Sequence, residues 1–177
     1  LQRAKGKNEE YNEFLDRVTG TLIEQIDNLS NIATEFSNFA KIPTARNQVF
    51  CLSEQLQKTI DLYETHNRAQ ITFNSNGFDC IEVNADREQL SRAIINLIRN
   101  GIQSVSHDKM GELKLKLDRR QHMAVISVKD NGSGIPVELR GKLFSPSFTT
   151  KTSGMGLGLS IVKNIVENFS GKIWFET

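Results

Sequence analysis

Three glycines at alternate positions, Gly154, Gly156 and Gly158, lie directly before a predicted helix. Glycine allows backbone N–H groups to face an anion, and a helix N-terminus adds partial positive charge, so this segment predicts a phosphate-binding loop. Its spacing is not that of the dinucleotide-binding fingerprint, whose third Gly comes one residue later. A Walker-type loop is also excluded, because no Gly-Lys pair in the chain is followed by Ser or Thr.

Two carboxamide side chains, Asn96 and Asn100, lie one turn apart on a helix predicted to run from Asp86 over about twenty residues, and Gln103 follows near the same stripe. Asn is a poor helix former, so the pair is unusual inside a helix. An amide oxygen can ligate Mg²⁺, and the amide NH₂ can donate to phosphate. A solvated helix face is the alternative, and the spacing alone does not decide between the two.

An acidic turn follows the strand predicted over residues 124–129. Asp130 precedes Gly132, Gly134 and Ile135, and the two glycines suit a tight backbone turn beneath a planar ligand. A carboxylate there can accept a hydrogen bond from the exocyclic amine of adenine. An ordinary surface turn is the alternative, since Asp-Asn-Gly is a common turn composition.

The segment from Leu143 to Lys151 places two Phe residues around small hydroxyl residues and ends in a cation. We interpret it as a mobile flap that is anchored by its aromatic side chains and reaches a phosphate with its hydroxyls and its lysine. The flap residues of interest are Phe148, Thr149, Thr150 and Lys151. An ordinary loop with two buried Phe side chains is the alternative.

The rest of the chain predicts the elements that position these groups. Strands are predicted over residues 49–52, 70–73, 80–83, 113–117, 124–129 and 172–175, and helices from Ser53 to about residue 64, from Asp86, and to about Asn168. The strands pair as hairpins and the helices lie between them. This order predicts an α+β fold, an α/β sandwich with a mixed, mainly antiparallel sheet and helices on one face.

A long helix is predicted over residues 8–42, which contain no Pro and a single Gly. Its apolar residues repeat every 3.5 positions, as in coiled coils and four-helix bundles. The seam residues are Leu15, Val18, Leu22, Gln25, Leu29, Ile32, Phe36 and Phe39. One helix cannot bury this stripe by itself, so another helix or a second chain must cover it. Packing against its own domain is the alternative.

Composition excludes several classes of protein. The chain has 177 residues and a net charge of +1, which gives no electrostatic case for nucleic acid or an acidic membrane. It contains no apolar run long enough to span a bilayer. Cys51 and Cys80 lie in apolar, strand-like stretches outside any CxxC, so we expect buried free thiols in a reducing, cytoplasmic setting and no structural zinc site.

In their order along the chain, the four segments resemble the GHKL nucleotide-binding superfamily of gyrases, chaperones, histidine kinases and mismatch-repair proteins. The resemblance covers residues 50–175, with residues 96–100 as the N box, 130–134 as the first glycine box, 144–151 as the F box and 154–158 as the second glycine box. It implies a Bergerat-type pocket for ATP and Mg²⁺. Asn100 would hold the metal, Asp130 would recognise adenine, and the segment from Gly154 would form the lid.

The resemblance assigns nucleotide contacts to all four boxes and to one residue of the N-box helix beyond them. The residues are Asn96, Asn100, Gln103, Asp130, Gly132, Gly134, Ile135, Phe148, Thr149, Thr150, Lys151, Gly154, Met155, Gly156, Leu157, Gly158 and Leu159. None of these is expected to be a catalytic acid, base or nucleophile.

Asn96 separates two classes within this superfamily. The ATP-hydrolysing members carry a Glu at this position, where it activates water, and this chain has an amide. Without a general base near the γ-phosphate, water is a poor nucleophile, whereas phosphoryl transfer to another acceptor needs mainly positioning and charge neutralisation. A protein-histidine kinase is therefore favoured over a GHKL ATPase. A non-catalytic binding module and a serine-directed protein kinase are weaker alternatives, given the intact boxes and the seam helix.

The N-terminal helix is similar, over residues 35–43, to the second dimerisation helix of sensor kinases of the nitrogen-regulation type. The resemblance implies that residues 1–46 are part of a dimerisation hairpin, and that residues 47–177 are the ATP-binding catalytic domain without its last strand. The acceptor His is expected upstream of Leu1. His66, His107 and His122 lack the sequence context of an acceptor and are expected to be ordinary surface residues.

The same resemblance implies partners and a location. The partners would be a second copy of the chain, joined through the helical bundle in the full-length protein, and the receiver domain of a response regulator, which takes the phosphoryl group on an Asp. The chain would be the cytoplasmic portion of a membrane-anchored bacterial sensor kinase. The membrane would be reached only through segments upstream of Leu1.

Overall fold

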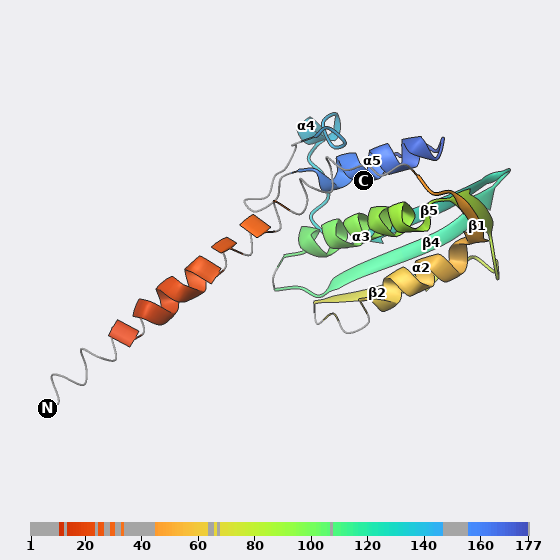
Figure 1. The fold of residues 1–177 in the computed structure, drawn as a ribbon. Coiled ribbons are helices and arrows are strands. Elements are labelled where there is room, and N and C mark those ends of the chain that lie inside the picture. Colours follow the sequence, from red (N-terminus) through yellow and green to blue (C-terminus); the bar gives the residue numbers. More distant parts are fainter. Residues whose placement is uncertain are drawn as a thin grey trace, which may run out of the picture. The chain divides into compact units, whose positions relative to one another are not determined.

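A computed structural model describes most of the chain, and Figure 1 shows its elements. The described residues are 11, 12, 14–23, 25, 26, 29, 30, 33, 45–63, 66, 68–106, 108–146 and 156–176. The chain divides into two compact units, Leu1–Ile42 with Thr149–Met155, and Pro43–Phe148 with Gly156–Thr177. The second, larger unit contains all the named helices and strands.

The elements of the larger unit follow one another with short connections (Figure 1). They are β1 (Gln48–Cys51), α2 (Leu52–Asp61), β2 (Ala69–Asn74), β3 (Glu82–Ala85), α3 (Arg87–Ser104), β4 (Gly111–Arg120), β5 (Met123–Asp130), α4 (Val137–Arg140) and α5 (Gly158–Asn168). α2 packs against β1, β2 and α3, while α3 packs against β4, β5 and α5. The helices therefore gather on one face of the strands, as the predicted sandwich requires.

β4 lies at the centre of a mixed sheet. It runs parallel to β2, with Ala69 opposite Gly111, and antiparallel to β5, with Leu117 opposite Ile126. β1 and β3 form a separate antiparallel pair. The mixed sheet with helices on one face confirms the predicted fold class, but the predicted pairing of β2 with β3 is wrong. The turn between them is local, whereas both strands find partners that are distant in sequence.

The core is set by alternation along β4. Leu113, Leu115 and Leu117 are 0–1% exposed and face the helices, while Lys114 and Lys116 between them are exposed. Strand side chains alternate between the two faces of a sheet, so this pattern turns one face toward α2 and α3 and leaves the other open. Burying a leucine side chain contributes about 1.5–3 kcal/mol, so these three residues are major contributors to stability.

Several predicted boundaries differ from the structure. Ser53 does not cap α2, because the Leu52 N–H already bonds the Ile81 carbonyl at 2.8 Å and the helix begins at Leu52. β4 continues through the residues expected to form a hinge, and the turn falls at Gln121, which has a φ of 55°. α4 was not predicted, since four residues carry too little periodicity to identify a helix.

The strand expected over residues 172–175 is not formed in the described part of the chain. Ile173 and Phe175 are half-buried and alternate with exposed residues, which is the pattern of a strand. A strand also needs ladder hydrogen bonds to a neighbour, and no described strand pairs with this segment. The sequence pattern was therefore read correctly as extended chain, but not as part of the sheet.

The two cysteines are joined in a disulfide, which contradicts the expectation of buried free thiols. Cys51 ends β1 and Cys80 lies just before β3, and the pairing of these strands brings their Cα atoms to 5.4 Å. Cys80 is also exposed, where a buried side chain was expected. Cysteine usage therefore gives no support for a reducing compartment.

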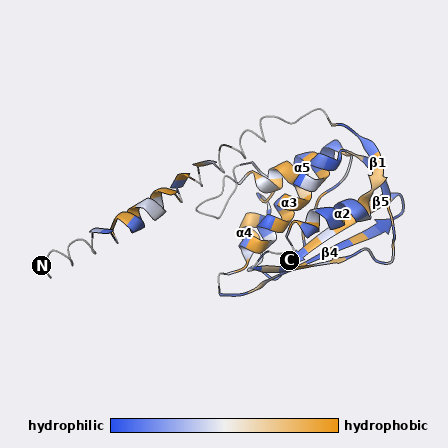
Figure 2. Ribbon diagram, turned by 60° about the horizontal axis from the view of Figure 1, so that its bottom comes forward, coloured by the Kyte–Doolittle hydropathy of each residue, from blue (hydrophilic) through white to orange (hydrophobic). Residues whose placement is uncertain are grey.

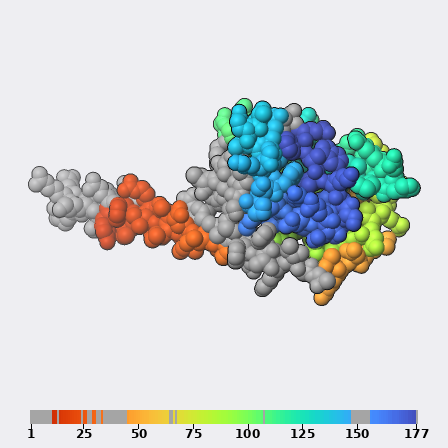
Figure 3. Space-filling view, turned by 90° about the horizontal axis from the view of Figure 1, so that it is seen from above, coloured from red at the N-terminus to blue at the C-terminus, as the bar shows by residue number. Residues whose placement is uncertain are grey.

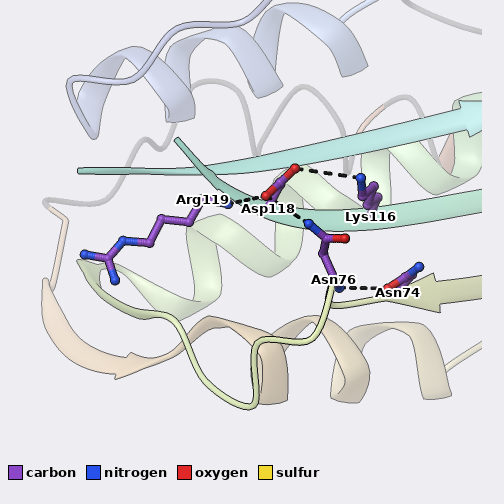
Figure 4. Close-up of polar contacts among 5 residues, drawn as sticks. All are labelled: Asn74, Asn76, Lys116, Asp118 and Arg119. Atoms are coloured by element: carbon purple, nitrogen blue, oxygen red, sulfur yellow. Dashed lines mark hydrogen bonds and ion pairs between the residues drawn. The ribbon is translucent and has the colours of Figure 1, made fainter. Parts of the chain in front are cut away.

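Asp118 ties the predicted turn after β2 to the end of β4 (Figure 4). Asn76 donates from its side-chain Nδ2 to Asp118 Oδ1 at 3.2 Å, and its backbone N–H donates to Asn74 Oδ1 at 2.7 Å. The backbone N–H of Arg119 also donates to Asp118 at 2.8 Å, and this bond is the largest reason that the pKa of Asp118 lies below its ordinary value. The contacts are structural and lie on the β2–β4 side of the sheet.

The smaller unit contains helical residues from position 11 to position 33 with interruptions in the description. Its large apolar side chains are exposed, including Leu15, Leu22 and Leu29 of the predicted seam, and Figure 2 shows apolar residues interspersed with polar ones along this helix. An apolar stripe without cover is what the seam prediction expects of one helix by itself. Ile32, Phe36 and Phe39 lie outside the described residues. Among the described residues, no helix has both the length and the apolar character of a membrane span.

Candidate nucleotide-binding site

α3 is the element from which the site is built, and its start is fixed by Asp86. Oδ1 of Asp86 accepts from the backbone N–H groups of Glu88 at 3.0 Å and Gln89 at 3.1 Å, as an N-cap does. Oδ2 accepts from the backbone N–H of Arg46 at 2.7 Å. Burial by itself raises the pKa of Asp86, but the hydrogen bonds from Arg46, Gln89 and Glu88 together lower it below its ordinary value. The predicted cap is therefore confirmed.

The amides of Asn96 and Asn100 lie against the first residue of α5. A Cβ added to Gly158 would stand 3.3 Å from Oδ1 of Asn96 and 3.5 Å from Nδ2 of Asn100. Both asparagines are half-buried, and Asn96 also donates from Nδ2 to the Arg92 carbonyl at 2.9 Å. The N box and the end of the second glycine box are thus in contact, although more than fifty residues separate them in sequence.

The start of α5 offers its backbone to an anion. No side chain of the described residues caps this helix, and Gly156 just before it has a φ of 67°, which favours glycine. Leu157 is buried and its carbonyl accepts from the Ser160 hydroxyl at 2.9 Å, which holds the first turn in place. α5 has eleven residues, so it carries a full helix dipole with its positive end beside Asn96 and Asn100.

Asp130 is held at the other end of α3 by two donors on one carboxylate oxygen. Oδ1 accepts from the Ser104 hydroxyl at 2.9 Å and from the Gly132 N–H at 2.9 Å. A Cβ added to Gly132 would collide with the side chain of Ser104, so glycine is required at this position. The turn after β5 therefore approaches the end of α3 closely, which was not visible in the sequence.

Asn131 fixes the same turn from the opposite side. Its Oδ1 accepts from the Glu112 N–H at 2.8 Å, and its Nδ2 donates to the Met110 carbonyl at 3.1 Å. Gly134 has a φ of 72°, so it turns the chain as the motif predicted. The motifs assigned no role to Ser104 or Asn131. An Asn in a turn is a signal for Asn131, whereas nothing local distinguishes Ser104.

Most of the predicted site residues that can be placed lie around α3. A Cβ on Gly101 would be 2.9 Å from Leu113 Cδ2 and 3.4 Å from Asp130 Cβ, so this glycine lets α3 approach β4 and the end of β5. Gln103 is exposed on this helix, and Ile135 is half-buried after the turn. α4, which follows Ile135, lies beside α5 (Figure 3). The predicted residues Phe148, Thr149, Thr150, Lys151, Gly154 and Met155 lie outside the described residues.

A magnesium ion fits the donor chemistry at Asn100 only in company with a ligand. The described residues contain no cluster of three or more His, Cys, Asp or Glu side chains that forms a metal cage. Mg²⁺ usually binds through one or two protein oxygens, with substrate phosphates and waters completing its octahedron. The Asn100 amide beside the positive end of α5 meets this requirement, because the same place suits phosphate.

Residues 85–177, more than half of the chain, match the family described as "Histidine kinase-, DNA gyrase B-, and HSP90-like ATPase". The chain therefore belongs to this family, and the resemblance to the GHKL superfamily is confirmed. Its relatives within the family are sensor histidine kinases. It is 32% identical over 166 residues to nitrogen regulation protein NtrY of Azorhizobium caulinodans, which covers 91% of this chain and 21% of that protein. It is 30% identical over 157 residues to sporulation kinase B of Bacillus subtilis, covering 88% of this chain and 36% of the other.

Solved histidine kinase structures have the same fold. The nucleotide-free catalytic domain of histidine kinase ThkA is 35% identical, with a TM-score of 0.66 over 73% of this chain and 86% of that chain. ThkA in complex with the response regulator protein TrrA is 30% identical, with a TM-score of 0.71 over 87% of this chain and 45% of that chain. The fold class is thus confirmed, and the chain spans about a fifth to a third of the length of the curated relatives named above.

Proposed function

We propose that this chain binds Mg·ATP as the catalytic domain of a two-component sensor histidine kinase and presents the γ-phosphoryl group to a histidine of the dimerisation domain. The observation that carries the proposal is the arrangement along α3. Asn96 and Asn100 contact the start of α5, and Asp130 is fixed at the C-terminal end of the same helix. One helix thus connects a phosphate-binding end with an adenine-binding end.

The base would be recognised by Asp130. Its Oδ1 is occupied by Ser104 and Gly132, which leaves Oδ2 to accept from the exocyclic amine of adenine. The turn that carries Asp130 is fixed on both sides, by Ser104 and by Asn131. A binding site made of groups that are already ordered loses little conformational entropy when the ligand arrives.

The phosphates would lie between Asn100 and the N–H groups at the start of α5. Asn100 would contribute an amide oxygen to the magnesium ion, which neutralises phosphate charge when bound. Asn96 would orient a phosphate oxygen through its amide. The predicted lid and flap residues from Phe148 to Met155, together with Gly156 to Leu159, would cover the phosphates and exclude water.

Transfer to a protein acceptor is favoured over hydrolysis by the amide at position 96. An Asn side chain cannot take a proton from water, so the site lacks a general base beside the γ-phosphate at this position. An acceptor histidine is itself the nucleophile and needs only to be brought in line with the γ-phosphate. The names of the curated relatives, which include histidine kinases, support this choice over an ATPase.

The remaining assignments follow from the resemblance to these kinases. We propose that residues 1–46 belong to the dimerisation domain and residues 47–177 to the catalytic domain, and that the whole protein is a homodimer. Its partner would be a response regulator, as in the complex of ThkA with TrrA. We propose a cytoplasmic position for this chain in a membrane-anchored sensor.

Isothermal calorimetry with ADP and Mg²⁺ tests the proposal. The wild-type chain is expected to bind ADP, and Asp130→Asn is expected to weaken binding, because the substituted amide turns a donor toward the adenine amine or loses the ionic acceptor. Asp118→Asn is the matched control, since Asp118 lies in the turn contacts of Figure 4. A folded wild-type chain that binds no adenine nucleotide contradicts the proposal.

A further inference from the structure

We propose that Ser104 is a specificity-determining positioning residue, which acts through Asp130 to select a purine with an exocyclic amine. The inference rests on the proposed nucleotide site and adds to it a residue that none of the four boxes contains. The observation behind it is the 2.9 Å hydrogen bond from the Ser104 hydroxyl to Oδ1 of Asp130.

The Ser104 hydroxyl has two acceptors within reach and a single proton. Its Oγ lies 2.7 Å from the Gly101 carbonyl and 2.9 Å from Asp130 Oδ1. A hydrogen bond to an ionised carboxylate is about twice as strong as one to a neutral acceptor, so the proton is directed toward Asp130. Ser104 is half-buried whereas Asp130 is exposed, so the hydroxyl approaches the carboxylate from the protein side.

The second donor on the same oxygen makes the carboxylate rigid. The Gly132 N–H also binds Oδ1, at 2.9 Å, and no described residue donates to Oδ2. Rotation of the carboxylate would exchange the two oxygens and break both bonds. The Ser104 hydroxyl and the Gly132 N–H therefore keep Oδ2 available to a ligand.

An oriented carboxylate oxygen discriminates between purines. Adenine presents an amine at its six position, which donates to Oδ2. Hypoxanthine and guanine present a carbonyl oxygen at that position, which a carboxylate repels. A site built to hydrogen-bond one group rejects an analogue without it because buried polar groups are then unpaired. Loss of the Ser104 hydroxyl frees the carboxylate to rotate, and the preference for adenine falls.

A purely structural role for Ser104 makes a different prediction. A hydroxyl that only bonds the Gly101 carbonyl helps to end α3, as Ser often does near helix ends. Its removal would then weaken binding of all nucleotides equally, through the whole site. The proposed role concerns only the ligand's amine, so ligands that lack the amine separate the two.

The test uses the full chain and three ligands: ADP, the diphosphate of purine riboside, which has hydrogen in place of the amine, and inosine diphosphate. Ser104→Thr and Ser104→Val form a matched pair, because they share a shape and differ in the hydroxyl. Any steric cost against Gly132 is common to both. Ser104→Ala is a second variant without the hydroxyl, and circular dichroism checks that each variant is folded.

Ser104→Thr is expected to bind ADP about tenfold more tightly than Ser104→Val, since a hydrogen bond to a charged group contributes about 1.5–3 kcal/mol and part of this is retained. The two variants are expected to bind the purine riboside diphosphate within about twofold of each other. The ratio of ADP to inosine diphosphate affinity is expected to fall in Val and Ala. Equal weakening for ADP and the purine riboside diphosphate, or no difference between Thr and Val, overturns the inference. Wild-type chain that binds none of the ligands instead refutes the proposed function.

Discussion

The Oδ1 atom of Asn96 stands 3.3 Å from the position that a Cβ on Gly158 would occupy. This contact joins a helix amide to the first residue of α5 and brings two predicted boxes together. It also leaves no spare room, because a Cβ contact at this distance is tighter than most in proteins. The absence of a side chain at position 158 is therefore part of the proposed phosphate site.

Gly158→Val is expected to weaken nucleotide binding by at least about tenfold, or roughly 1.4 kcal/mol. The added side chain occupies the space between α5 and the two asparagines that a phosphate would need. Gly141→Val is the matched control, because nothing lies within 4 Å of a Cβ at that position. Fluorescence titration with a labelled adenine nucleotide measures both, and an equal effect of the two substitutions would refute the role of Gly158.

Gly132→Ala is expected to lower the affinity for adenine nucleotides and the stability of the fold. The new Cβ would collide with Ser104 and would stand 2.7 Å from Oδ1 of Asp130, so the turn after β5 must move. An overpacked position of this kind costs about 1–3 kcal/mol. Thermal unfolding and ADP titration measure the two effects. Retention of wild-type stability and affinity would show that the turn is free to shift away from α3.

Asp86→Ala is expected to destabilise the chain by about 1–2 kcal/mol at neutral pH, because it removes the cap of α3. The folded-state pKa of Asp86 is lowered, so its carboxylate stabilises the fold above the unfolded pKa of about 3.9, and this contribution is lost as pH falls through the folded pKa. The stability difference between wild type and variant should therefore shrink below about pH 4. Urea unfolding at several pH values measures it, with exposed Asp79→Ala as control. A difference that persists unchanged in acid contradicts the ionic cap.

Leu115→Ala is expected to cost about 2–5 kcal/mol of unfolding free energy, since Leu115 is 1% exposed in the centre of the sheet. Lys114→Ala is the adjacent control on the open face of β4, where substitutions usually change stability by less than about 0.5 kcal/mol. Chemical denaturation gives both values. Similar costs for the two would show that the helices do not cover the face on which Leu115 lies.

The sequence predicted the parts of the fold that depend on neighbouring residues. The cap at Asp86, the length of α3 and the turn at Asn74–Gly77 follow from local chemistry, and all are present. The pairing of β2 with β4 and the close approach of Cys51 to Cys80 depend on contacts between distant segments, and neither was predicted. A hairpin turn suggests that the flanking strands pair, but a better partner elsewhere in the sheet overrides that preference.

The same division applies to the candidate site. Asn96, Asn100 and Asp130 were identified because their residue types and spacing suit nucleotide chemistry. Ser104 was not, because its importance arises only when β5 ends beside the last turn of α3. Residues that orient other residues carry no chemical signature of their own, so sequence reasoning finds the groups that touch a ligand before it finds their supports.

The most direct test of the proposed site is the effect of Mg²⁺ on ADP affinity in wild type and in Asn100→Ala, measured by calorimetry in Mg²⁺ and in EDTA. Wild type is expected to bind ADP more tightly with Mg²⁺, and Asn100→Ala to lose that gain while its metal-free affinity changes little. A gain from Mg²⁺ that survives in Asn100→Ala, or a folded wild type without ADP affinity, would contradict the account.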